Sequence, residues 1–212
     1  MRAWKKALPL TILAATLVVL ASGPALAGGY SAGVLGGLDL PMGDFKDASK
    51  TGYDFGATGD YALAPMWGAG IDLAYRSFKA KDELNQAVAA ELILLGAPAG
   101  TTVDIKWTAI QGGVHLRATP PMTGPIKAYG QVGGAAYSLK EKIDVSSGGG
   151  GDITKTKFGY NVGAGVDYAA APTVSVGIVA QYHNVPAKDD FGADLSWVSV
   201  AGKVTFHIPM GK

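Results

Sequence analysis

The sequence predicts an all-β chain folded as an eight-stranded antiparallel up-and-down transmembrane β-barrel. Three observations predict it: long stretches in which every second residue is apolar, connections that alternate between short turns and long loops, and aromatic residues near both ends of the apolar faces. Several of these stretches keep alternating for more than about ten residues, twice the usual length of a strand in a globular domain. Such lengths suit a tilted membrane crossing.

The start of the chain predicts a cleaved secretory signal peptide. Basic residues precede an apolar run over residues 7–21, and Ala-Leu-Ala follows at residues 25–27. The alternative is a membrane anchor, but the apolar run is short for a bilayer-spanning helix and a small-residue exit is typical of cleavage. We therefore expect residues 1–27 to be removed and residues 28–212 to form one outer-membrane β-barrel domain.

The composition of the remaining chain excludes several classes of protein. Three of the 18 Lys and Arg residues and none of the 17 Asp and Glu residues lie in the predicted signal, which leaves an excess of two acidic groups. A balance so close to neutral argues against a nucleic-acid partner. The absence of Cys excludes disulfides and thiolate zinc sites. No second apolar run is long enough for a membrane helix, so any span must be made by strands.

Eight strands are expected where apolar residues alternate with polar or small ones. They cover Gly29 to Leu40, Thr51 to Leu63, Pro65 to Lys79, Thr102 to Ala118, Pro125 to Lys140, Lys155 to Ala169, Thr173 to Val185 and Leu195 to Ile208. Their connections alternate between the short "ALAP", "TPPMTG" and "AAAPT" and longer polar or Gly-rich segments. This asymmetry is typical of an outer-membrane barrel, with short periplasmic turns and long outside loops.

One face of these strands is expected to meet lipid. Folding the second and third strands about "ALAP" sets Tyr61 opposite Trp67 and Tyr53 opposite Tyr75, with small or aliphatic residues between. Tyr and Trp settle at the two interfaces of a bilayer, so this banding favours an apolar face turned outward. The same folding sets Tyr160 opposite Tyr182. The predicted membrane-interface aromatics are Tyr53, Tyr61, Trp67, Tyr75, Tyr160, Tyr168, Tyr182 and Phe206.

The opposite face predicts a packed polar lumen. Eight strands enclose a bore just wide enough for side chains to fill, so small residues and paired charges are needed there. We expect Asp54 and Arg76, diagonal neighbours across one hairpin, to pair and close the bore, and Asn161 to face Gln181. The alternative is a small ion-lined pore. The predicted lumen network is Asp54, Asp60, Asp72, Arg76, Asn161, Asp167, Gln181 and Lys203.

One stretch, residues 103–118, departs from the simple pattern. Its apolar positions run from Val103 to Ala109 and then change phase to Ile110 and Leu116. Either a β-bulge lies near Ala109, or the strands extend beyond the membrane and their outer ends follow different rules. We favour the second explanation.

These features together resemble the OmpA- and OmpX-type family of small eight-stranded outer-membrane barrels over nearly all of residues 28–206. The resemblance rests on the signal peptide, the strands with aromatic residues near both ends, "VGAGVDY" and the last strand "SWVSVAGKVTF". The resemblance implies bacterial outer-membrane lipid and lipopolysaccharide as surroundings, and recognition by the outer-membrane assembly machinery. The assembly signal would be Ser199, Ala201, Val204 and Phe206, with Ala201 where Gly is usual and "HIPMGK" following the aromatic residue.

The architecture itself is unspecific about function, since it serves structural anchors, adhesins, ligand sensors and lipid enzymes. We expect a structural or surface-interaction role without catalysis, cofactor or metal. An enzyme alternative is a lipid A-modifying barrel, because such deacylases carry a His followed after one residue by Ser-Asn. His183, which we place at the outer rim, is followed by Asn184 and Val185, so the nucleophile is missing. His115 and His207 lack the carboxylate spacing of a metal site. A soluble lipocalin-like barrel is a further alternative and needs its apolar face inside.

The loop over residues 80–100 is the candidate for a surface ligand. It contains helix formers and then the apolar run Leu92 to Leu95. An exposed apolar run favours a partner or a lipid surface, whereas the alternative is that the loop caps the lumen or extends the strands. The Gly-rich "SSGGGGD" lacks the pattern of a phosphate-binding loop, so we expect a flexible outside loop there.

Overall fold

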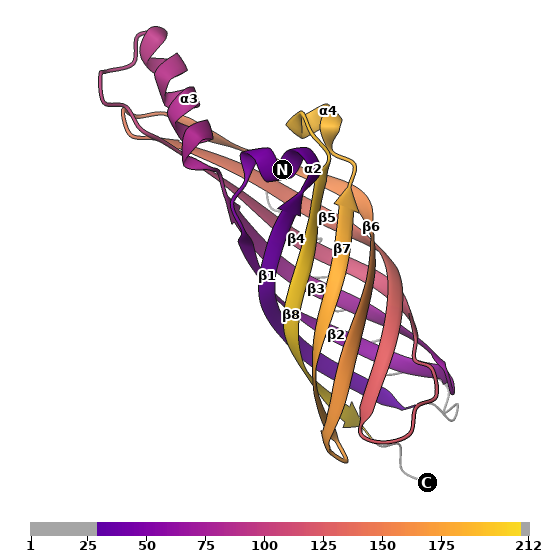
Figure 1. Cartoon of the computed structure of the whole chain (residues 1–212). Coiled ribbons are helices and arrows are strands. Elements are labelled where there is room, and N and C mark those ends of the chain that lie inside the picture. The colour runs from indigo at the N-terminus through magenta and orange to yellow at the C-terminus, as the bar shows by residue number, and fades with distance from the viewer. Residues whose placement is uncertain (1–28, 209–212) are drawn as a thin grey trace, which may run out of the picture.

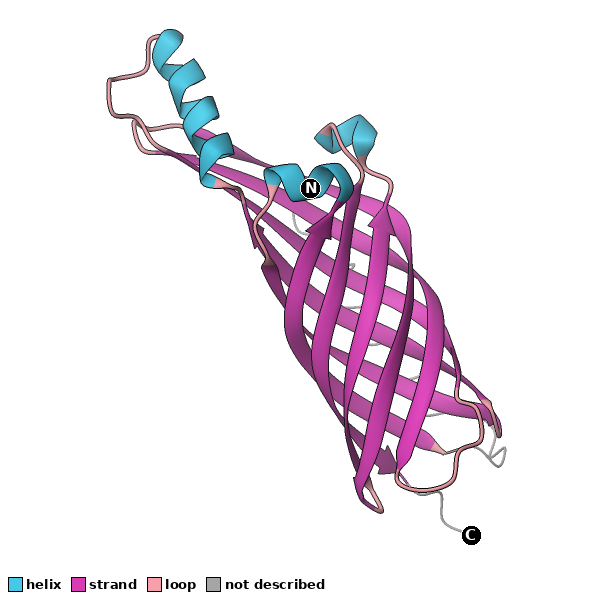
Figure 2. Cartoon of the chain, viewed as in Figure 1, coloured by secondary structure: helices cyan, strands magenta, loops and turns pink. Residues whose placement is uncertain are grey.

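The eight strands close into a barrel, with the helices gathered at one end (Figures 1 and 2). The computed structural model describes residues 29–208. Each strand is antiparallel to both neighbours, and β1 pairs with β8 to complete the closure. The predicted fold class is therefore confirmed. The predicted signal peptide, residues 1–27, and the end of the tail, residues 209–212, lie outside the described residues.

The elements follow one another as the alternating sequence pattern predicts. In chain order they are β1 (Tyr30–Met42), α2 (Gly43–Ala48), β2 (Gly52–Ala64), β3 (Trp67–Lys79), α3 (Asp82–Leu94), β4 (Val103–Ala118), β5 (Ile126–Val145), β6 (Gly150–Ala171), β7 (Val174–Val185), α4 (Lys188–Phe191) and β8 (Leu195–Ile208). The three helices within residues 29–208 lie in the predicted long loops, at the end opposite the short turns (Figure 2). Among residues 29–208, no helix combines the length and apolar character that crossing a bilayer requires.

Strand β6 shows which way the barrel wall faces. Phe158, Tyr160 and Val162 expose 79%, 53% and 46% of their surfaces, whereas the intervening Asn161 exposes 2%. The apolar set therefore points away from the bore, and the polar set points into it. This orientation suits a wall solvated by lipid. It contradicts the lipocalin-like alternative, which needs the apolar set inside.

Two hairpin registers differ from the predicted ones by two residues. Tyr61 pairs with Ala69 rather than Trp67, and Tyr75 pairs with Phe55 rather than Tyr53. In the β6–β7 hairpin, likewise, the partner of Tyr182 is Val162 rather than Tyr160, and that of Asn161 is His183 rather than Gln181. Both hairpins carry an irregularity beside the turn, between Ala62 and Ala64 and between Ala169 and Ala171. The two-residue turns, at residues 65–66 and 172–173, lie later in the chain than the centres of "ALAP" and "AAAPT", and this moves the pairing. Because the difference is an even number of residues, every side chain keeps its face.

Strand β4 contains no bulge near Ala109. Its pairing with β3 and β5 is continuous through that position, and Ala109 is 3% exposed beside Ile110 at 57%. The inward face instead changes in chemistry, from apolar residues such as Val103 to polar ones from Gln111 onward. The prediction that the outer ends of these strands follow different rules therefore fits the structure.

The three strands β4, β5 and β6 are longer than their neighbours. β5 has 20 residues and β6 has 22, whereas a tilted membrane crossing needs about 9–11. The excess projects beyond the rim on the helical side (Figure 1). We predicted a flexible loop for the "SSGGGGD" segment, and this was wrong. The segment forms the tight end of the β5–β6 hairpin. Gly148, Gly149 and Gly150 adopt positive φ angles there, which only Gly adopts without strain.

Candidate functional site

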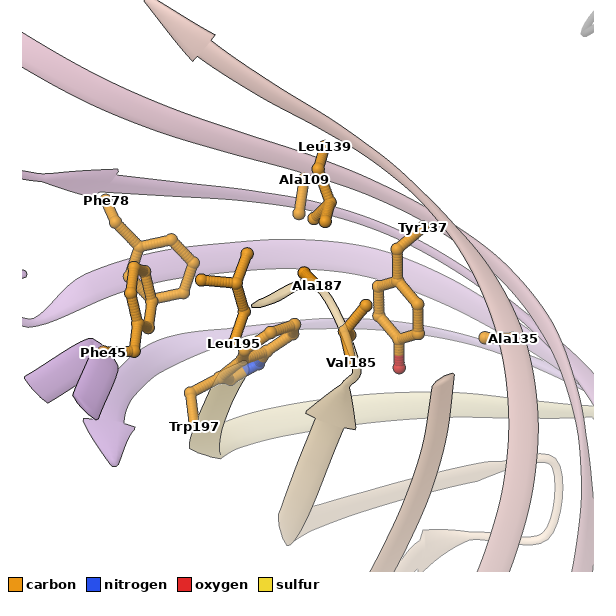
Figure 3. Packing of buried hydrophobic residues seen from close by; sticks show 10 residues of the cluster. All are labelled: Phe45, Phe78, Ala109, Ala135, Tyr137, Leu139, Val185, Ala187, Leu195 and Trp197. Carbon is orange, nitrogen blue, oxygen red and sulfur yellow. The ribbon is translucent and has the colours of Figure 1, made fainter. Parts of the chain in front are cut away.

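The outer half of the lumen is filled by an apolar cluster that we call the outer plug (Figure 3). Its centre is Trp197, which is 1% exposed and meets Phe78 and Tyr137 edge-on with ring centroids 5.8 Å apart. Phe45 of the short helix α2 also enters it and is 3% exposed. The outer plug consists of Phe45, Phe78, Ala109, Ala135, Tyr137, Leu139, Val185, Ala187, Leu195 and Trp197.

Arg76 forms a polar layer against this plug. Its guanidinium lies 5.5 Å from the centre of the Trp197 ring, and Nε lies 3.5 Å from Oδ2 of Asp39. Nη1 donates to Gln111. We predicted that Arg76 pairs with Asp54, and this was wrong, because its carboxylate partner is Asp39. Asp54 lies directly opposite Arg76 in the register, but the long Arg side chain reaches across the narrow bore to groups on other strands.

His183 lies inside this layer and not at the outer rim, where we predicted it. The ring is 0% exposed and stacks on Trp197 with an interplanar angle of 13°. Nε2 is 3.3 Å from Nη2 of Arg76, which can only donate, so Nε2 accepts and Nδ1 donates to the Tyr137 hydroxyl at 3.0 Å. The ring is therefore neutral. The hydroxyl beside it is as deeply buried as the His, so the pair offers no exposed nucleophile.

A second His, His115, holds the middle of the lumen. Its Nε2 lies 2.8 Å from Asp60 and its Nδ1 lies 2.8 Å from Asp72, so the ring donates from both nitrogens and is a cation. Arg117 adds a second positive charge, 3.2 Å from Asp60. Gly70 makes room for the ring, because a Cβ there would lie 2.5 Å from it. We call Asp60, Asp72, His115 and Arg117 the His115 cluster.

The sequence predicted Asp60 and Asp72 in the lumen but not that His115 and Arg117 would meet them there. The signal was present in the predicted faces, because Asp60, Gly70 and His115 fall in one row across β2, β3 and β4. Reading that row required the correct register.

Lys203 forms the third polar layer. It is 4% exposed, and its Nζ lies 3.0 Å from both the Asp167 carboxylate and the Tyr129 hydroxyl. Gln181 donates to Asn161 over 3.4 Å, although the two are not paired in the register. All eight residues of the predicted lumen network thus point into the bore.

The lumen opens toward the short turns. A cavity of about 580 Å³ lies at that end, bordered by Asp60, Arg117, Asp167 and His207. It ends at the His115 cluster and the Lys203 layer, which contribute Asp60, Arg117 and Asp167 to its lining. Across residues 29–208, His, Cys, Asp and Glu side chains nowhere gather in a group of three or more suited to a metal ion.

The projecting part of the strands carries α3, and together they form what we call the outer platform. Leu84, Val88 and Leu92 of the helix pack against Val103 and Ile105 of β4. The loop over residues 80–100 thus covers the strand extension, which was one of the two predicted alternatives. Of its apolar run, Leu92 packs on the strands, whereas Leu94 and Leu95 at the end of the helix stay exposed.

The match to a protein family covers most of the chain. The model of the outer membrane protein beta-barrel domain family matches residues 13–202. The chain belongs to this family. The family and its solved members place the protein in the bacterial outer membrane. No curated protein sequence matches the chain significantly.

Solved outer membrane protein barrels share this fold at low sequence identity. Neisserial surface protein A is 17% identical with a TM-score of 0.51, over 84% of this chain and 96% of its own. Ail of Yersinia pestis is 14% identical with a TM-score of 0.51, over 85% and 97%. A major outer membrane protein from Thermus thermophilus is 11% identical with a TM-score of 0.56, over 86% and 100%. Such identities show the fold alone.

In this family's orientation, with short turns in the periplasm, the predicted interface aromatics fall at two levels. Tyr61, Trp67, Tyr168 and Phe206 lie near the turns, and Tyr53, Tyr75, Tyr160 and Tyr182 lie toward the helices. All eight point outward. Of the predicted assembly signal, Val204 and Phe206 point outward, whereas Ser199 and Ala201 point inward and are each 3% exposed. The roles of both sets stay predictions.

Proposed function

We propose that the protein is a non-conducting outer-membrane barrel that presents its outer platform for interaction at the cell surface. The closed lumen carries this proposal. Trp197, His183 and Arg76 are 1%, 0% and 2% exposed in the outer half, and His115 and Lys203 are 3% and 4% exposed below them. A water-filled pore leaves its lining hydrated, and these side chains are not. The protein acts as an anchor rather than as a porin or a catalyst.

The barrel wall supports the proposed partners within the membrane. The outward aliphatic and aromatic surface fits lipid in the periplasmic leaflet and lipopolysaccharide in the outer leaflet. We assign recognition by the assembly machinery to Ser199, Ala201, Val204 and Phe206, after export directed by residues 1–27. Replacing Phe206 with Ala would lower the amount of barrel assembled in the outer membrane.

The outer platform supports the proposed surface role. Ail of Yersinia pestis was solved in complex with a heparin analogue, sucrose octasulfate. On the platform of this protein, Lys106, Lys140 and Lys142 each lie within 3.0 Å of an Asp carboxylate. Their positive charge is therefore largely neutralised, and we do not extend a sulfated ligand to this protein. Its exposed apolar helix end is the better candidate for contact.

Conductance across planar bilayers tests the closed lumen. The purified wild-type barrel should show no stable single channels, and a Phe45→Ala, Trp197→Ala variant, which removes two rings of the outer plug, should show more current. Stable channels of the wild type would overturn the proposal.

Surface binding tests the platform. Bacteria in which residues 82–95 are replaced by a short Gly-Ser linker should adhere less to cell surfaces than the wild type. Replacing residues 188–194 at the same end of the barrel is the control. Equal adhesion of all three strains would remove the surface role.

A further inference from the structure

The end of α3 is the most exposed apolar feature of the outer platform. Leu94 is 88% exposed and Leu95 is 78% exposed. Phe158 exposes a similar fraction, 79%, but it lies on the outward face of β6, two residues from the predicted interface aromatic Tyr160. No charged residue occurs between Leu92 and Val103. Two adjacent, highly exposed Leu side chains therefore lie in an uncharged stretch. The helix α3, at whose end they lie, projects from the end of the molecule opposite the short turns (Figure 1).

Most backbone N–H groups of this tip donate to carbonyl groups of the tip or of α3. The N–H of Gly96 donates to the Ile93 carbonyl and that of Ala97 to the Leu92 carbonyl, each over 3.0 Å. Together with the φ of +102° at Gly96, this is a Schellman ending of the helix. Both the N–H and the hydroxyl of Thr101 donate to the Pro98 carbonyl, and Pro98 itself has no N–H. Few donors would lose water if the tip entered an apolar medium.

The helix that carries the tip is positioned by its contacts with the rest of the platform. The opposite side of α3 packs on β4, and Lys50 holds the start of the helix through an ion pair of 2.7 Å with Asp82. Leu94 and Leu95 thus take no part in the packing that fixes the helix. They extend a helix that packs on the strands from Leu84 to Leu92, so their position relative to the barrel is set by that packing.

We infer that this tip, residues 92–100, inserts into a zwitterionic phospholipid surface that faces the bacterium. The inference rests on the proposed surface role of the platform. A convex apolar point without charges has nothing to fix its orientation in a protein pocket, whereas a bilayer accepts it in any rotation. The nearest charged group on the helix is the acidic Glu91, so an anionic surface such as lipopolysaccharide is disfavoured.

Vesicle binding by the whole barrel tests this inference. The chain has no Cys, so an Ala99→Cys variant can carry one environment-sensitive fluorophore at the tip. The barrel is held in nanodiscs and mixed with phosphatidylcholine vesicles, with empty nanodiscs as the blank. We expect a blue shift of the fluorophore and flotation of the nanodiscs with the vesicles. Leu94→Ser with Leu95→Ser should weaken vesicle binding by about tenfold or more.

A matched control separates the tip from apolar surface in general. Ile153→Ser removes a half-exposed apolar side chain from the projecting part of β6 and should leave vesicle binding unchanged. Absence of wild-type binding, unchanged binding of the double Leu variant, or equal loss in the Ile153 variant would each overturn the inference. So would binding that requires anionic lipid or disappears in high salt. Planar-bilayer conductance of the same preparations is independent of the tip, so failure here is distinguishable from failure of the proposed function.

Discussion

Replacing His115 with Leu should destabilise the barrel strongly. In the wild type the imidazolium lies between Asp60 and Asp72 at 2.8 Å from each. Leu leaves the two carboxylates facing each other without the cation that joins them. Removing one partner of a buried ion pair costs about 3–5 kcal/mol. The carboxylates retain 10% and 14% exposure, and Arg117 still compensates Asp60, so we expect the lower end, about 3 kcal/mol.

Urea unfolding in lipid vesicles, followed by Trp fluorescence, measures this change. His207→Leu is the matched control, because that ring makes one hydrogen bond, to Ser175, at the open end of the lumen. Its loss should cost about 1 kcal/mol or less. The urea dependence of the free energy of unfolding should stay the same in both variants, since the folded structure buries the same surface.

A second substitution identifies the cause. If the cost comes from an uncompensated charge, Asp72→Asn should recover stability in the His115→Leu background, although the same change destabilises the wild type. A His115→Leu cost no larger than that of His207→Leu, or a further loss on adding Asp72→Asn, would refute the reasoning.

Three further expectations follow from the wall and the outer end. Gly177→Ala should destabilise by about 1–3 kcal/mol, because its Cβ would meet a cross-strand carbonyl at 2.5 Å and overlap a lumen carboxylate, whereas the outward Gly134→Ala should change stability by less than about 0.5 kcal/mol in the same urea assay. In single-Trp variants, brominated lipid should quench the outward Trp67 strongly and leave Trp197 unquenched; equal quenching would contradict the assigned faces. Hydrogen bonds from Lys157 and a neighbouring Lys of β6 lower the pKa of Asp190, so this tie of α4 to the barrel is complete at neutral pH and is lost as the pH falls below about 4. Amide-exchange protection factors in α4 should fall there and stay constant between pH 6 and 8.

The alternation of side chains divided each strand into two faces, and the aromatic banding and loop asymmetry decided which face points outward. Asn161 and Asp167 were assigned to the lumen on these grounds, and Tyr160 and Tyr168 to the outer face, and they lie there. The pattern has this power because a strand offers only two faces, and lipid and a narrow bore demand opposite chemistry of them.

Contacts across the bore could not be predicted in the same way. The partner of Arg76 is Asp39 because the Arg side chain spans the lumen, and a hairpin drawing shows only neighbouring strands. The predicted registers were wrong because the alternation does not show which two residues near "ALAP" or "AAAPT" form the tight turn. His183 was placed at the rim because the length of the strand extension, and hence the depth of the outer plug, depends on how far β5 and β6 pair beyond the membrane.

The seam between the first and last strands makes assembly an all-or-none event. β1 and β8 pair from Tyr30 opposite Ile208 to Met42 opposite Ser196, and Ser199 donates to Asp39 across the seam inside the bore. Until β8 arrives, β1 and β7 both present an unpaired edge, which hydrocarbon penalises at every free peptide group. A chain truncated before residue 195 therefore lacks β8 and cannot form a stable, smaller closed barrel. Changes in the outer loops leave this seam untouched, so the surface of the protein can vary widely while its wall cannot.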